Sequence, residues 1–184
     1  MSSSPSAALD LRAHVMAAAL QLSRSTPAVA TVEDAIRAAK LPADSLPALW
    51  PDPAQFEFDL LAALLDEVRD SVAKTTLGMK AGLPRLQLAI ETYLEANLAR
   101  PAVRKLALRL QARAAGAAIL RSRVAGFTLM MEMELKTLQW PHAAATARLF
   151  TAALLEIAYA EHEAERALPE LRDHVSRYFE GGHA

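Results

Sequence analysis

The feature that most constrains the fold is a long segment, from Pro53 to about Met79, in which apolar side chains recur every three or four positions. This spacing places them on one face of an α-helix. Asp52 followed by Pro53 is a strong start signal, because Asp is a favoured N-cap and Pro fits the first helical position. A helix of this length measures about 40 Å. It can connect a small N-terminal module to a larger C-terminal one.

Helical spacing continues along the rest of the chain. Ala and Leu supply 40 and 29 of the 184 residues, whereas Gly supplies 6 and aromatic residues 5%. This composition favours helix over strand. We therefore expect an all-α fold of about nine helices, three of them short and N-terminal. Besides the helix at 53–79, we expect helices at about 9–23, 32–39, 45–50, 84–98, 120–138, 142–165 and 168–180, and one more that begins at 101.

Composition also excludes several classes of protein. The chain has no cysteine, so neither a disulfide framework nor a cysteine-based zinc site is possible. Its first ten residues lack the basic and apolar regions of a signal peptide. The longest uncharged stretches have about 11 residues, fewer than the roughly 20 that span a bilayer. We expect a soluble, cytoplasmic protein that does not enter a membrane.

One local motif is more informative than the composition. Residues 31–56 read TVEDAIRAAKLPADSLPALWPDPAQF. Thr31 followed three residues later by Asp34 is close to a capping box at a helix start, and Leu41–Pro42 ends that helix. The stretch resembles the helix-turn-helix of the TetR family of bacterial regulators. The positions that match its cap, its small or apolar residues and its aromatic plug are Thr31, Val32, Asp34, Ala38, Ala39, Leu41, Ser45, Leu46 and Trp50.

The resemblance covers about residues 11–68 and implies a domain organisation. It implies a DNA-binding domain at 9–52, followed by a ligand-binding and dimerisation domain at 53–180. Carried over to this sequence, the residues expected at operator DNA are Thr31, Arg37, Lys40, Ala43 and Ser45. Without the resemblance, the same stretch is also compatible with three small helices that form a bundle and bind no DNA.

Several positions depart from the family pattern. Glu33 stands where an arginine is common, Lys40 at the glycine of the turn, and Ala43 where a basic or polar residue is common. Pro47 replaces a tyrosine, and Pro53 replaces the lysine that opens the fourth helix. A proline inside a helix costs about 3 kcal/mol, whereas one in the first turn costs little. We therefore predict a shortened recognition helix at about 45–50 with Asp44 as its N-cap.

The net charge of −1 hides an uneven distribution. Residues 1–55 carry four basic and five acidic side chains, whereas residues 100–123 carry seven basic side chains and no acid. Phosphate contacts need cations or free backbone N–H groups. The basic stretch is either a solvated helix face or the approach site of an acidic ligand or partner.

The C-terminal two thirds of the chain suggests a pocket and an interface. In the TetR family the effector pocket lies among the middle helices, and the candidates here are Tyr93, Phe127, Met130, Met131 and Trp140. The effector would be apolar or amphipathic. Met and aromatic residues at helical spacing are, however, also typical of an ordinary hydrophobic core without a pocket.

The family forms its homodimer through the last two long helices. The corresponding apolar residues are Leu149, Phe150, Ala153, Leu154, Ile157, Leu171, Val175 and Tyr178. An intrachain hairpin would bury the same faces.

Catalytic and metal-binding patterns find little support. The five histidines form no Glu-x-x-His pair inside a helix, and the chain has no Gly-rich phosphate loop or nucleophile elbow. We expect no catalytic residues, no metal and no cofactor.

The sequence leaves two hypotheses open. One is a TetR-like dimeric regulator that releases its operator when a ligand binds. The other is a ligand-binding or protein-interaction dimer of the same fold that has weakened or lost DNA binding.

Overall fold

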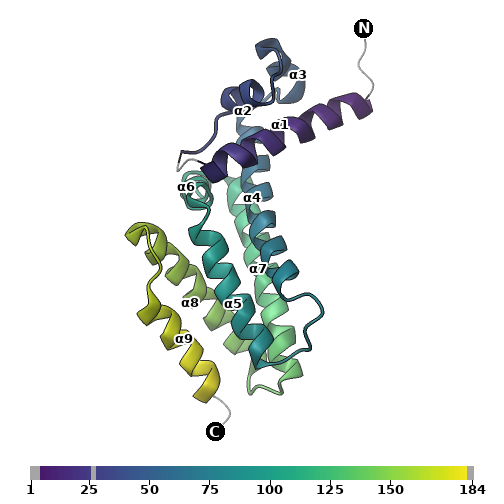
Figure 1. Cartoon of the computed structure of the whole chain (residues 1–184). Coiled ribbons are helices and arrows are strands. Elements are labelled where there is room, and N and C mark those ends of the chain that lie inside the picture. Colours follow the sequence, from purple (N-terminus) through teal and green to yellow (C-terminus); the bar gives the residue numbers. More distant parts are fainter. Residues whose placement is uncertain (1–4, 26–27, 182–184) are drawn as a thin grey trace. The chain divides into compact units, whose positions relative to one another are not determined.

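The computed structural model describes residues 5–25 and 28–181, and in these ranges all regular secondary structure is helical (Figure 1). The all-α prediction of about nine helices is confirmed for this part of the chain. The α-helices are α1 (Pro5–Ser25), α2 (Val32–Ala38), α3 (Leu46–Leu49), α4 (Pro53–Thr75), α5 (Leu83–Leu98), α6 (Pro101–Leu110), α7 (Ala114–Thr137), α8 (Ala143–Ala164) and α9 (Pro169–Gly181), with a 3-10 turn, η1 (Ala43–Ser45), before α3.

Most helix boundaries agree with the sequence to within a few residues. The main differences are α1, which begins at Pro5 rather than at about Leu9, and α4, which ends at Thr75 rather than at about Met79. Gly78 follows in the left-handed region with φ of 76°, a conformation that cannot continue a right-handed helix. The sequence also predicts a break after the first helix at residues 24–27 and an end of the last helix at Gly181–Gly182, of which Pro27 and Gly182 lie outside the described residues.

The chain forms two compact units. The first, here called the N-terminal unit, consists of Met1–Leu65 and Arg100–Ala117, and the second, the C-terminal unit, consists of Asp66–Ala99 and Ala118–Ala184. The N-terminal unit therefore extends past the expected boundary at residue 52 and includes α6. Helices α4 and α7 contribute residues to both units.

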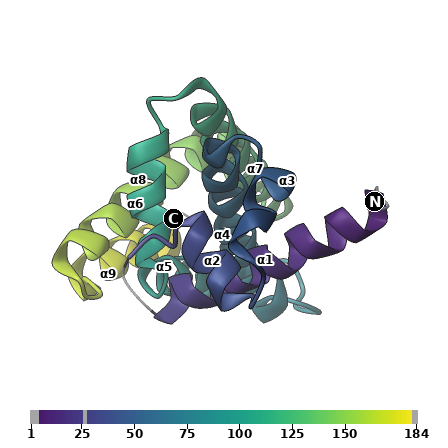
Figure 2. The same cartoon turned by 90° about the horizontal axis from the view of Figure 1, so that it is seen from above.

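In the N-terminal unit, α1 contacts α2, α3 and α6 (Figure 2). The first turns of α1 project beyond the other helices of this unit in both views (Figures 1 and 2). The core is formed by side chains that are less than about a tenth exposed. These include Val15 and Ala19 of α1, Ala35 and Ile36 of α2, Trp50 just after α3, Phe56, Leu60, Leu61 and Leu64 of α4, and Leu106 and Leu110 of α6.

The corner between α6 and α7 depends on a close backbone approach. A Cβ atom at Gly116 would lie 2.3 Å from the carbonyl oxygen of Leu110 and 2.8 Å from its Cβ atom. Real Cβ atoms do not tolerate such separations, so only glycine fits this position. Gly126 in the same helix has no such neighbour, because nothing lies within 4 Å of its Cβ position.

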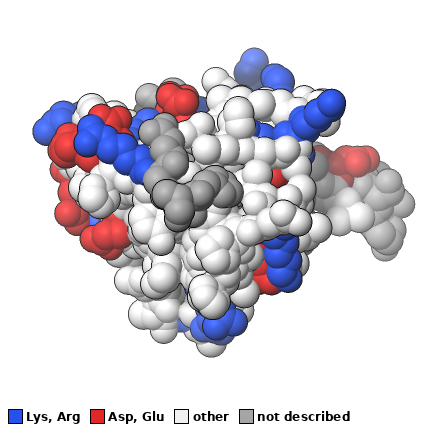
Figure 3. Space-filling view, turned by 90° about the horizontal axis from the view of Figure 1, so that it is seen from below, with Lys and Arg blue, Asp and Glu red and all other residues white. Residues whose placement is uncertain are grey.

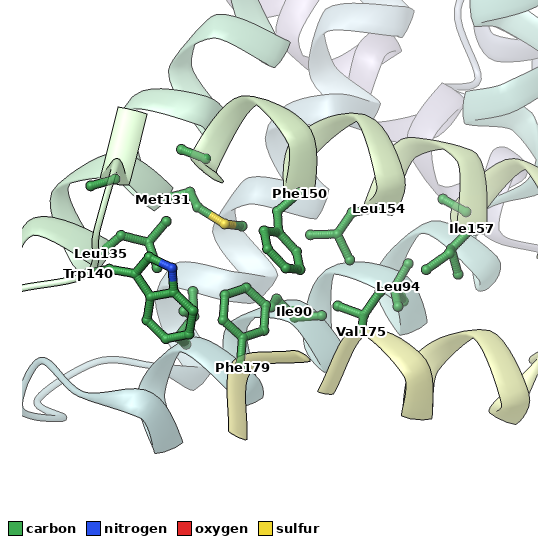
Figure 4. Packing of buried hydrophobic residues seen from close by; sticks show 14 residues of the cluster. Ile90, Leu94, Met131, Leu135, Trp140, Phe150, Leu154, Ile157, Val175 and Phe179 are labelled. Carbon is green, nitrogen blue, oxygen red and sulfur yellow. The ribbon is translucent and has the colours of Figure 1, made fainter. Parts of the chain in front are cut away.

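The C-terminal unit is built around a hydrophobic core shared by α5, α7, α8 and α9. Helix α5 contacts both α8 and α9. Figure 4 shows Phe150 of α8 and Phe179 of α9 facing each other, with ring centroids 4.1 Å apart. Trp140 packs on Phe179 at 5.6 Å in an edge-to-face arrangement, a favoured geometry for aromatic pairs.

A buried ion pair closes the α8–α9 turn. Glu161 is fully buried and accepts hydrogen bonds from Arg172 Nε (2.6 Å), Arg172 Nη2 (2.8 Å) and the Leu168 backbone N–H (3.0 Å). Burial opposes ionisation of Glu161, but these donors outweigh it, so its pKa is lowered. The carboxylate thus fixes the start of α9 against the end of α8.

Helix α8 is the one helix in the described ranges that is long and apolar enough to cross a membrane by length and composition alone. Its Ala147, Phe150, Leu154 and Ile157 are buried in the C-terminal core. The core helix of a soluble protein has the same composition.

Candidate nucleic-acid interface and ligand-binding region

The start of α2 forms the predicted capping box. Thr31 is the N-cap, and its Oγ1 accepts a hydrogen bond from the Asp34 backbone N–H at 3.1 Å. The Asp34 carboxylate in turn accepts from Thr31 Oγ1 at 2.9 Å and from the Thr31 N–H at 3.4 Å. The side-chain and backbone hydrogen bonds from Thr31 lower the pKa of Asp34. The hydroxyl expected at a DNA phosphate is therefore already engaged by a carboxylate.

The turn after α2 ends the helix with a Schellman motif. The Leu41 N–H donates to the Ile36 carbonyl oxygen (3.1 Å), and the Lys40 N–H donates to the Arg37 carbonyl oxygen (3.1 Å). This pattern requires a left-handed residue, and Lys40 has φ of 57°. Lys40 thus adopts the backbone conformation for which glycine is the preferred residue, and its side chain is exposed.

The recognition segment is short, as Pro47 predicts. The 3-10 turn at Ala43–Ser45 leads into α3, which spans only Leu46–Leu49. Asp44 was expected as the N-cap, and this is wrong. Helical geometry begins at Ala43, two residues before the start that an Asp44 N-cap would give, because the Ser45 N–H donates to the Pro42 carbonyl oxygen at 3.0 Å.

A carboxylate that the sequence did not single out anchors this segment. Asp59 of α4 accepts hydrogen bonds from Arg12 Nη2 (2.7 Å), Trp50 Nε1 (3.0 Å) and Gln55 Nε2 (2.7 Å). The Arg12 guanidinium also lies 5.0 Å from the centroid of the Trp50 ring. The aromatic plug is thus fixed by one acid to both α1 and α4. An acid nine residues after a tryptophan is too common a spacing to reveal this from sequence.

The residues expected at DNA are all accessible, but acids lie beside them. Thr31, Arg37, Lys40 and Ala43 are exposed, and Ser45 is half-buried. Arg37 forms an exposed ion pair with Asp34 at 3.3 Å. Of the two cations in this set, Arg37 is therefore partly neutralised by a neighbouring acid.

The N-terminal unit also contains α6 from the basic stretch. Arg109 forms an ion pair with Glu57 of α4 at 2.9 Å, and the Arg113 guanidinium lies 4.9 Å from the Phe58 ring centroid. An open depression of about 200 Å³ lies between the start of α2, the start of α4 and α6. Its lining includes Thr31, Glu33, Pro53, Phe56, Glu57 and Arg109.

The residues proposed for a ligand pocket lie in the C-terminal unit, and most of them come together. Tyr93 of α5 stacks on Phe127 of α7 with centroids 4.8 Å apart. Met131 and Trp140 are buried in the same hydrophobic cluster, against which Tyr93 and Phe127 pack. Met130 differs, because its side chain is 56% exposed and lies outside this cluster. Burial raises the pKa of Tyr93 to about 12, so its hydroxyl remains a neutral polar group within an apolar region.

The residues proposed for a dimer interface separate into two groups. The buried ones belong to the intrachain core, namely Phe150, Leu154, Ile157 and Val175. The others are accessible: Leu149 is 72% exposed, Tyr178 56% and Leu171 37%, while Ala153 is half-buried. Only this second group offers a surface to another molecule.

The described residues contain no group of three or more His, Asp or Glu side chains that could hold a metal ion.

Comparisons with known proteins identify the fold. No family model and no curated protein matches the chain. A solved structure does: the TetR family repressor AlkX from Dietzia sp. strain DQ12-45-1b, described as implicated in biodegradation of n-alkanes. The identity is 18%, the match covers 93% of this chain and 97% of that chain, and the TM-score is 0.56. At this identity the likeness shows that the chain has a TetR-like fold.

Proposed function

We propose that the protein is a TetR-like transcriptional regulator that binds operator DNA as a homodimer and responds to a small ligand. The observation that carries this proposal is the geometry of the N-terminal unit. A capped α2, a left-handed turn at Lys40 and a short recognition helix follow one another on a scaffold fixed by Asp59. This is the arrangement of a helix-turn-helix, in which the second helix is presented to the major groove.

The ligand response would follow from the composition of the C-terminal core. The region around Tyr93, Phe127, Met131 and Trp140 is mainly apolar, with few polar groups such as the Tyr93 hydroxyl and the buried Asn97 side chain, so it suits an apolar or amphipathic effector. A ligand that binds one conformation more tightly shifts the population toward it. Helix α4 has residues in both units and is the direct covalent path between this core and the helix-turn-helix.

The homodimer would use the accessible apolar residues of α8 and α9. Leu149, Leu171 and Tyr178 remain exposed although they are large and apolar. Figure 3, in which all residues other than Lys, Arg, Asp and Glu are white, shows that charged residues lie mainly at the edges of the face seen from below. A twofold dimer that covers exposed apolar residues is the commonest form of oligomer. The regulator would be soluble and cytoplasmic, without catalytic activity.

A specific observation favours the second candidate, a dimer of the same fold that has lost DNA binding. Between Thr31 and Pro53 the chain carries two basic residues, Arg37 and Lys40, and four acids, Glu33, Asp34, Asp44 and Asp52. The surface of the helix-turn-helix itself is therefore negative, whereas a DNA-reading surface usually carries a positive patch.

The decisive experiment is a DNA-binding titration with the full-length protein and the region upstream of its own gene. Fluorescence anisotropy is measured at several salt concentrations, with a scrambled duplex of equal length as the control. The proposed regulator binds the upstream duplex more tightly than the scrambled one at 150 mM salt. Equal binding, or none, supports the second candidate instead. Light scattering of the wild type and of Leu149→Glu tests the dimer, which we expect the charge to dissociate.

A further inference from the structure

We propose that the basic residues of α6 provide the main contacts of this protein with the DNA phosphate backbone. The inference rests on the proposed function for its partner and goes beyond it in assigning the contacts to a helix outside the helix-turn-helix. The first argument is charge. Residues 1–65 carry four basic and seven acidic side chains, a formal charge of −3. Residues 100–117 add five basic side chains and no acid, which brings the N-terminal unit to +2.

The excess positive charge of the unit therefore comes from α6, its N-cap residue and the turn that follows it. These cations are Arg100, Arg104, Lys105, Arg109 and Arg113. Lys105 and Arg109 are four residues apart and exposed, so they lie on the same side of the helix. The opposite side carries buried Val103, Leu106 and Leu110, which hold α6 in the core of the unit. The helix is thus fixed, with Lys105 and Arg109 exposed, whereas Arg100 and Arg104 are half-buried.

The second argument is position. Arg109 lines the same open depression as Thr31 and Glu33 at the start of α2 and Pro53 at the start of α4. A DNA backbone that reaches the start of α2 therefore comes within reach of the Arg109 guanidinium. Without α6, the depression would present Glu33 and Glu57 and no cation.

The third argument is that Arg109 can exchange partners. Its ion pair with Glu57 has side chains that are 50% and 30% exposed, and such exposed pairs contribute little to stability. A guanidinium forms two parallel hydrogen bonds with a phosphate as readily as with a carboxylate. A phosphodiester also releases condensed counterions when it is neutralised, which a lone carboxylate does not. The DNA backbone is therefore the favoured partner of this surface.

The test uses the variant Lys105→Gln/Arg109→Gln and a control that removes the same charge from the C-terminal unit. The control is Arg69→Gln/Lys74→Gln, two exposed residues of α4. Binding of the upstream duplex and of the scrambled duplex is measured by anisotropy between 50 and 300 mM salt. Each lost phosphate contact lowers the slope of log K against log salt by about 0.9, which is close to tenfold in affinity at 0.1 M.

The expected result is that the α6 variant loses affinity for both duplexes equally, with a slope lower by up to about 1.8, while the control keeps the wild-type slope. Glu57→Gln, which releases Arg109, should bind both duplexes more tightly. If the upstream duplex is preferred and the α6 variant binds it like wild type, the inference is overturned and the proposed function stands. If both duplexes bind equally and the α6 variant loses them, the function fails and the inference stands. Absence of any duplex binding refutes both.

Discussion

The close approach of Gly116 to Leu110 gives a sharp prediction about stability. Gly116→Ala places a methyl group 2.3 Å from a backbone carbonyl oxygen, and backbone cannot move aside as a flexible side chain can. The corner between α6 and α7 must open, which disturbs the burial of Leu110. Gly126→Ala makes the same chemical change in the same helix, at a position where the new methyl group meets nothing within 4 Å.

The magnitudes follow from two opposing effects. Replacing glycine by alanine inside a helix gains about 1 kcal/mol, and forcing an extra methyl group into a packed site costs about 1–3 kcal/mol or more. Because the separation at Gly116 is far below contact distance, we expect the cost to prevail by about 1–2 kcal/mol. A chain of this size shifts its Tm by about 2–4 °C per kcal/mol. Gly116→Ala should therefore lower Tm by roughly 2–8 °C, whereas Gly126→Ala should raise it by roughly 1–4 °C.

Both variants are compared with the wild type by urea and thermal unfolding, followed by circular dichroism at 222 nm. The sign difference between the two variants is the quantity that matters, because helix propensity alone predicts the same gain for both. If Gly116→Ala is as stable as Gly126→Ala, the close approach does not constrain the corner and the argument from Leu110 is refuted.

Three further predictions concern the turn, the cap and the buried ion pair. Lys40→Gly should raise the free energy of unfolding by about 0.5–1 kcal/mol, because glycine adopts positive φ without strain. A urea midpoint lower than that of the wild type would contradict this. Thr31→Ala should lower it by about 1 kcal/mol through loss of the cap, and an unchanged urea midpoint would show that the capping box contributes nothing. Glu161→Gln leaves Arg172 without its carboxylate and should cost about 3 kcal/mol at pH 7. Because the folded-state pKa of Glu161 lies below the ordinary 4.5, this contribution is complete above that value and is lost as pH falls through the folded-state pKa. The wild type and the variant should therefore converge in acid, and a constant difference down to pH 2 would disprove the ion-pair origin.

Local features of the fold could be predicted from the sequence because short-range interactions determine them. The capping box at Thr31 and the shortening of the recognition helix by Pro47 follow from residues within one or two turns. The left-handed turn at Lys40 follows less directly. The resemblance placed a glycine there, and the Schellman hydrogen bonds rather than the residue type impose the conformation.

Long-range features could not be predicted. The association of α6 with the N-terminal helices joins residues more than 35 positions apart. Counting charge along the sequence therefore separates the basic residues of α6 from the N-terminal helices that they contact in the folded protein. Similarly, Met130 and Met131 are neighbours about 100° apart on α7, and only the packing of the core shows that Met131 is buried and Met130 exposed. The apolar residues of α8 that suggested an interface are largely needed by the core of their own chain.

The two tryptophans have an optical consequence. The chain contains only two, Trp50 and Trp140, and they lie in different units. The Trp50 indole is beside a guanidinium and a carboxylate, whereas Trp140 lies against Phe179, so their emission spectra should differ. A Trp50→Phe or Trp140→Phe protein then carries a single intrinsic fluorophore in one known unit. In rapid mixing with the effector proposed above, the delay between the two emission changes would measure how fast a change in the C-terminal unit is followed by one in the N-terminal unit, without any attached dye.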